Sequence, residues 1–188
     1  GERGSGGEGE VGVWRAPRRS GGAGGARRAG QSAYLGWGTD LHTESNLNVP
    51  ALLPDTYCSD VNERLTLYKR LSNCESKDDL DAMHEELVDR FGTMPEPAQA
   101  LIGCHALRIL ARPLGVSRVD ATHESVVMQF GKDTIAKGAV DGAKIIGLMQ
   151  QRRNWRLAGP EKLRIEAKLP TWQERVQAAR DAFKALAP

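Results

Sequence analysis

Two carboxylates three residues apart, Glu86 and Asp89, are the side chains in this sequence whose type and spacing raise a functional question. On a helix, residues at this spacing are neighbours on one face. That face differs from the one formed by the apolar residues around them, so the pair is predicted to point away from the core. A solvated surface is the simplest interpretation of such a pair, and a charge-dependent contact with a partner is the alternative.

Catalytic and metal-binding patterns are missing from the chain. The sequence contains no GxxxxGK[ST] loop, no GxGxxG between a strand and a helix, no HExxH and no GxSxG. No two carboxylates are recognisable as held across a cleft for acid–base work. The remaining reactive side chains are scattered: His42, His84, His105, His123, Cys58, Cys74 and Cys104. We therefore predict that this chain is not an enzyme by itself and holds neither a metal nor a cofactor.

The three cysteines are an odd number and lack CxxC spacing. This pattern favours free thiols in a reducing cytoplasm over a disulfide framework, and small core residues over reactive groups.

The helix that must carry the carboxylate pair spans Ser76 to Gly92. Ser76 is a good N-cap, and the acidic residues that follow suit the positive end of the helix dipole. Gly92 is placed to end the helix in a left-handed C-cap. The apolar positions recur at helical spacing and form one stripe: Leu80, Met83, Leu87, Val88 and Phe91.

The other elements follow from hydrophobic periodicity and turn residues. A short strand ending at Val49 is predicted to lie at a sheet edge, because Pro50 follows. The further elements are helices over 60–71, 95–111, 141–151 and 171–186 and hairpins over 116–130 and 155–167. The grouped order of strands and helices predicts an α+β fold, with antiparallel hairpins or a sheet covered by about five helices.

Residues 1–40 differ sharply from the rest of the chain. They contain 13 of the 21 glycines, six arginines, three glutamates and one aspartate, whereas the chain from residue 41 has 20 basic and 20 acidic residues. We predict a division at residue 44 into a disordered or non-native leader, 1–44, and a folded domain, 45–188. A translation of GC-rich DNA in the wrong frame would give a similar leader. An arginine/glycine tail that binds nucleic acid is the functional alternative.

Charge is also uneven within the folded part. Ten acidic and five basic residues lie between Asp55 and Arg90, and seven basic against two acidic residues lie between Lys144 and Lys168. Such asymmetry orients protein partners. It also leaves open a nucleic-acid-binding role for the Arg152–Arg156 region.

Four segments resemble the C-terminal domain of the bacterial transcription-repair-coupling factors. They are NVPALLPDTYCSDVNERLTLYKRL (Asn48–Leu71), HEELVDRFG (His84–Gly92), PAQAL (Pro97–Leu101) and LAGPEKLRIE (Leu157–Glu166). They occur in the family's order and spacing from about residue 46 to the end. Residues 1–40 depart from the family, where the end of a helicase-type motor is expected.

The resemblance implies a cytoplasmic, ATP-dependent double-stranded DNA translocase as the parent protein, with ATP and Mg used in a motor that this chain lacks. Such a protein displaces stalled RNA polymerase and recruits the excision-repair damage-recognition protein. The C-terminal domain is implied to be a non-catalytic, autoinhibitory domain that docks on the parent's amino-terminal module through Glu86 and Asp89. No membrane contact is expected.

Overall fold

The computed structural model describes residues 11–14, 43–131, 134 and 140–188. Within the stretch predicted to be a leader, Val11–Trp14 forms strand β1. Residues 1–10 and 15–42 lie outside the described part, so the proposed division at residue 44 stays a prediction.

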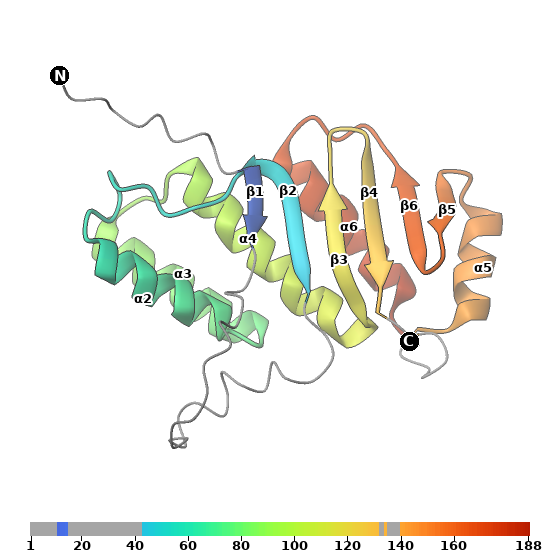
Figure 1. The fold of residues 1–188 in the computed structure, drawn as a ribbon, viewed down its shortest axis with the longest axis horizontal. Coiled ribbons are helices and arrows are strands. Elements are labelled where there is room, and N and C mark those ends of the chain that lie inside the picture. Colours follow the sequence, from blue (N-terminus) through green and yellow to red (C-terminus); the bar gives the residue numbers. More distant parts are fainter. Residues whose placement is uncertain (1–10, 15–42, 132–133, 135–139) are drawn as a thin grey trace, which may run out of the picture.

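Six strands of the described residues form one mixed sheet, in the order β1-β2-β3-β4-β6-β5 (Figure 1). The other strands are β2 (Glu44–Pro50), β3 (Val116–Ala121), β4 (Ser125–Phe130), β5 (Trp155–Gly159) and β6 (Lys162–Glu166). Both predicted hairpins are present, and every neighbouring pair is antiparallel except β2 and β3. The β2–β3 pair is parallel because three helices connect the two strands, which returns the chain to the same end of the sheet.

The prediction that the first strand lies at a sheet edge is wrong. Pro50 is the last residue of β2, and β1 pairs along the side of β2 that faces away from β3. A proline at the end of a strand removes no central ladder bond, so it does not require an edge position.

The described residues form five α-helices, which confirms the α+β class. They are α2 (Val61–Ser72), α3 (Lys77–Phe91), α4 (Glu96–Ala111), α5 (Gly142–Gln151) and α6 (Trp172–Leu186). Helices α4 and α6 pack against each other and lie behind the sheet in Figure 1, whereas α2 and α3 lie side by side beyond β1. None of the helices in the described ranges is long and apolar enough to span a membrane.

Helix α4 joins two hydrophobic cores. One lies between the sheet and helices α4, α5 and α6 and includes Leu107, Met128, Leu163 and Phe183. The other fills the space among α2, α3 and α4 and includes Leu67, Leu71, Leu87 and Leu101. Because α4 contributes to both, it fixes the α2–α3 pair relative to the sheet.

All three cysteines are buried free thiols: Cys58, Cys74 and Cys104. This confirms their predicted role as small core residues. Burial raises the pKa of the Cys104 thiol to about 12, so this group stays protonated and unreactive.

Candidate functional site

Helix α3 begins as its sequence predicts. The Ser76 hydroxyl accepts a hydrogen bond from the Asp79 backbone N–H at 3.1 Å, and Asp78 and Asp79 occupy the first turn. Leu80, Met83 and Leu87 are buried in the hydrophobic core among α2, α3 and α4. These contacts fix which side of α3 faces inward, and they leave the positions of the carboxylate pair outside the core.

The other end of α3 is held by Tyr57, which the sequence did not identify. Its hydroxyl oxygen lies 3.0 Å from the Leu87 carbonyl oxygen and 2.8 Å from that of Gly92. The Tyr57 ring also packs against Phe91, with 5.5 Å between ring centroids. Tyr57 therefore ties the last turn of α3 and the following Gly92 to the segment that precedes α2.

The predicted left-handed C-cap at Gly92 is only half correct. Its φ is +86°, which glycine adopts far more easily than other residues, but its ψ is −163° rather than the value near +50° of a left-handed helix turn. The chain leaves α3 in an extended direction and enters α4 within four residues. The glycine is thus needed for the exit, with a different backbone geometry from the predicted one.

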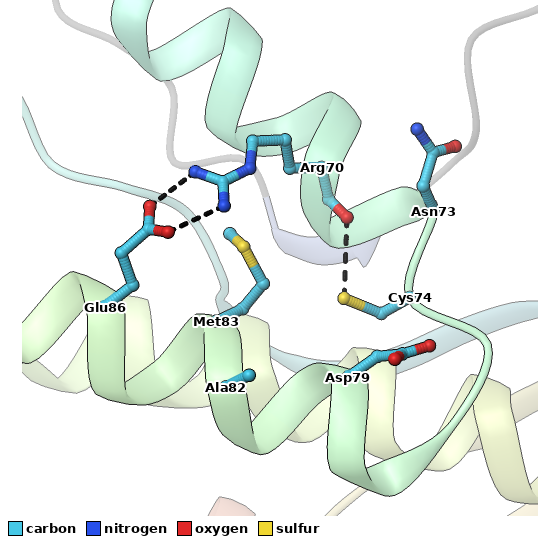
Figure 2. A pocket seen from close by; sticks show the side chains of 7 residues that line it. All are labelled: Arg70, Asn73, Cys74, Asp79, Ala82, Met83 and Glu86. Carbon is cyan, nitrogen blue, oxygen red and sulfur yellow. Dashed lines mark hydrogen bonds and ion pairs between the residues drawn. The ribbon is translucent and has the colours of Figure 1, made fainter. Parts of the chain in front are cut away.

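Glu86 does not point freely into solvent. Both oxygens of its carboxylate accept from the Arg70 guanidinium on α2, with Nη2 2.7 Å from Oε1 and Nη1 bonded to Oε2 (Figure 2). Arg90, one turn further along α3, lies 3.4 Å from Oε2 and pairs with Glu63 on α2. The four side chains form an alternating row, Glu63–Arg90–Glu86–Arg70, which we call the ion-pair ladder and which joins the two helices.

Asp89 is in a different state from Glu86. It is exposed on α3, and within the described ranges the structure gives its carboxylate no hydrogen bond or ion pair. The prediction that both carboxylates face away from the core holds for Asp89, whereas Glu86 lies at the seam between α2 and α3. The two acids are close in sequence and unequal in availability.

The ion-pair ladder shifts the pKa values of two of its residues. Hydrogen bonds from Arg70 lower the pKa of Glu86, and the same bonds raise the pKa of Arg70. The side chains of Arg70 and Glu86 are 44% and 35% exposed. Water therefore screens the pair, and such exposed pairs contribute about 0–1 kcal/mol to stability. The pair can consequently be broken without unfolding the domain.

A groove of about 460 Å³ lies beside the Arg70–Glu86 pair. Cys74, Ala82 and Met83 supply its less polar lining, and its polar lining comes from Arg70, Asn73, Asp79 and Glu86 (Figure 2). The Cys74 thiol lies 3.4 Å from the Arg70 carbonyl oxygen. The groove therefore has a small apolar centre with charged groups on its rim.

Arg108 of α4 binds the corner between α2 and α3 through backbone carbonyl groups. Its Nη2 donates to the carbonyl oxygens of Cys74 at 2.8 Å and Leu71 at 3.2 Å. Leu71 lies in the last turn of α2 and Cys74 lies two residues beyond the helix, where backbone acceptors lack helical partners. This buried guanidinium fixes the position of the α2–α3 corner relative to α4. It thereby also positions the ion-pair ladder.

Sequence reasoning missed most of the ladder. Glu86 and Arg90 are four residues apart on one helix, a spacing that signals an ion pair. Glu63 and Arg70 carry no such signal because they come from another helix. In the described ranges no three His, Cys, Asp or Glu side chains gather as metal ligands. The chemistry that the ladder offers is the exchange of charge-assisted hydrogen bonds with a partner.

The comparisons with known proteins agree with this fold. The family model described as TRCF domain matches residues 47–139. The chain is 35% identical over 162 residues to the transcription-repair-coupling factor of Escherichia coli and 36% identical over 163 residues to that of Haemophilus influenzae. In each case the match covers 86% of this chain and 14% of the relative. The chain therefore spans about one seventh of the length of these relatives.

A solved structure described as the C-terminal domain of transcription-repair coupling factor has a similar fold, with a TM-score of 0.66 and 22% identity. The match covers 79% of this chain and 93% of that structure. The family match and the shared architecture point the same way, and the chain belongs to the transcription-repair-coupling factor family, of which it carries the C-terminal domain.

Proposed function

We propose that this domain is a non-catalytic, autoinhibitory docking domain of a transcription-coupled DNA repair factor. It binds the amino-terminal module of its parent protein and masks that module's contact surface for the excision-repair damage-recognition protein. The proposal draws on membership of the family and on the acidic face of α3. In the described residues the reactive side chains are buried or isolated, which fits a role in binding.

The observation that carries the proposal is the exposed Asp89 beside the ion-pair ladder. An exposed carboxylate next to alternating charges offers directional hydrogen bonds to an arginine-bearing partner. Rigid helices hold both groups, because α3 is capped at Ser76 and fastened by Tyr57 at its other end. A preformed, rigid surface loses less conformational entropy when it binds.

The direct test is charge reversal of the pair, E86K/D89K, in the full chain. Binding to the separately produced amino-terminal module of the same parent is measured by calorimetry at low salt. Attraction to arginines becomes repulsion, so we expect binding to weaken at least about 30-fold, or about 2 kcal/mol. E124K/D181K is the matched control, because it makes the same change in net charge at exposed positions on the β3–β4 turn and α6. Equal affinities for wild type and E86K/D89K would refute the docking role.

For the parent protein, we propose the activity that the resemblance to this family implies. It is a cytoplasmic, ATP- and Mg-dependent DNA translocase that removes stalled RNA polymerase and recruits the excision-repair machinery. The nucleotide and the DNA bind to a motor, and this domain has a regulatory role. ATP hydrolysis by the purified chain, reduced by substitution of the chain's own residues, would contradict this assignment of roles.

A second candidate function is an accessory nucleic-acid-binding domain, favoured by one feature of the sheet. Arg156 on β5 lies directly opposite Arg164 on β6, and Glu166 is 3.8 Å from both. Like charges in a cross-strand pair repel, so a phosphate that binds between the two arginines would reduce their repulsion. Gel-shift assays with and without residues 1–40, over a range of salt concentrations, separate this role from docking. DNA binding that falls steeply with salt and is lost in R156Q would support it.

A further inference from the structure

The two carboxylates of the proposed docking site differ in what already binds them. Asp89 is exposed, whereas Glu86 accepts hydrogen bonds from Arg70 with both oxygens and from Arg90 with one. A carboxylate has about four lone-pair sites, so three donors leave little room for another guanidinium. A partner arginine that approaches Glu86 also meets two positive charges, those of Arg70 and Arg90.

Arg70 is the donor that takes both Glu86 oxygens, and its surroundings allow it to leave. It is anchored at one end, in the last turn of α2, and 44% of its side chain is exposed. The groove beside it gives the displaced side chain a place to lie over Met83, with the Asp79 carboxylate on the opposite rim (Figure 2). Breaking one exposed pair and forming another with Asp79 involves a small net change in free energy.

We propose that Arg70 is a built-in competitor for Glu86, which sets the strength of docking and selects the partner. It occupies the carboxylate in the free domain, and an arginine of the partner must displace it. This inference rests on the proposed docking function. The ladder thereby rejects lysine-bearing partners, because a single ammonium group cannot replace the two parallel hydrogen bonds that Arg70 makes.

The first experiment needs no partner and tests whether Arg70 occupies Glu86 in solution. The Glu86 carboxyl is titrated by NMR in the full chain, as wild type and as R70Q, R70K and K69Q. We expect the pKa of Glu86 to rise toward its ordinary value of 4.5 in R70Q, because its main hydrogen-bond donor is lost. K69Q is the matched control, because Lys69 is the exposed neighbour of Arg70 and its substitution removes the same charge. Equal pKa values for Glu86 in R70Q and K69Q would overturn the proposal at this step.

The second experiment measures docking on the amino-terminal module of the same parent by calorimetry. We expect R70Q to bind about twofold to fivefold more tightly than wild type, since the competitor is worth roughly the free energy of one exposed ion pair. R70K should gain less, because lysine keeps the charge but loses the bidentate geometry. K69Q should leave the affinity within about twofold of wild type.

A double-mutant cycle separates the two levels of the argument. In an E86Q background, R70Q should bring no gain, because the contested carboxylate is gone. If E86K/D89K binds as well as wild type, the docking role itself fails. If E86K/D89K loses binding but R70Q weakens docking, Arg70 contacts the partner or orients Glu86, and the competitor role is overturned.

Discussion

His105 on α4 is fully buried, and its burial has a measurable consequence in acid. The Arg108 Nε donates to its Nδ1 over 3.3 Å, so the imidazole accepts at this nitrogen and is neutral. Desolvation, and next the positive charge of Arg108, lower the pKa of His105 to about 3. The same histidine in the unfolded chain has an ordinary pKa of 6.5.

The sign of the effect follows from proton counting. Between pH 6.5 and pH 3 the unfolded chain binds a proton at residue 105 that the folded protein does not bind, so acid favours unfolding. The stabilising effect is fully present above pH 6.5 and is lost as the pH falls. At pH 5 the loss is about 2 kcal/mol, from 1.5 pKa units at 1.36 kcal/mol each. That is a large part of the 5–15 kcal/mol expected for a domain.

Urea unfolding of wild type and H105Q at pH 8 and pH 5 measures this contribution. Glutamine does not titrate, and its amide oxygen can accept the hydrogen bond from Arg108. Whatever H105Q costs at pH 8, its free energy of unfolding should fall about 2 kcal/mol less than that of wild type between the two pH values. H84Q, at an exposed position on α3, controls for the loss of a histidine as such.

Parallel pH dependence of wild type and H105Q would refute the reasoning. It would mean that the folded protein accepts a proton at His105 as readily as the unfolded chain. The most direct check on that outcome is the NMR titration of the His105 ring, whose signals should not move above pH 5.

Two further substitutions test how the site is held. R108M should destabilise the domain by about 1–3 kcal/mol, as measured by urea unfolding, because the Cys74 carbonyl loses the Arg108 donor, whereas the Leu71 carbonyl keeps the Cys74 backbone N–H at 3.2 Å. It should also broaden the NMR signals of the α2–α3 corner, and sharp, unshifted signals there would count against the anchoring role of Arg108. G115A should cost roughly 2 kcal/mol or more in the same assay, because φ at this residue is +69° and an added Cβ would collide with Thr134. An unchanged denaturation midpoint would show that the turn before β3 can rearrange.

The sequence determined the local elements because their signals are local. Ser76 was readable as a helix cap, and its side chain accepts from the backbone N–H three positions further on. On α6 the apolar residues recur at spacings of three and four, and Val176, Ala179, Phe183 and Leu186 are buried. Periodicity alone predicted the α+β class, since alternation and helical spacing are visible within a few residues.

Strand neighbours could not be predicted with the same certainty. β2 pairs with β3 although 65 residues lie between Pro50 and Val116, and its other neighbour, β1, comes from the stretch expected to be a leader. No local pattern encodes which strand lies beside which. The edge assignment based on Pro50 failed for this reason.

The carboxylate pair shows the same division most clearly. Sequence placed Glu86 and Asp89 on the outer side of α3, because the apolar stripe fixes the inner side. The tertiary structure decided that they are not equivalent. An antiparallel partner helix brings Arg70, sixteen residues earlier in the chain, onto the Glu86 carboxylate and leaves Asp89 exposed. Helical spacing defines a face within one helix, and only the packing of two helices determines which charges meet across the seam.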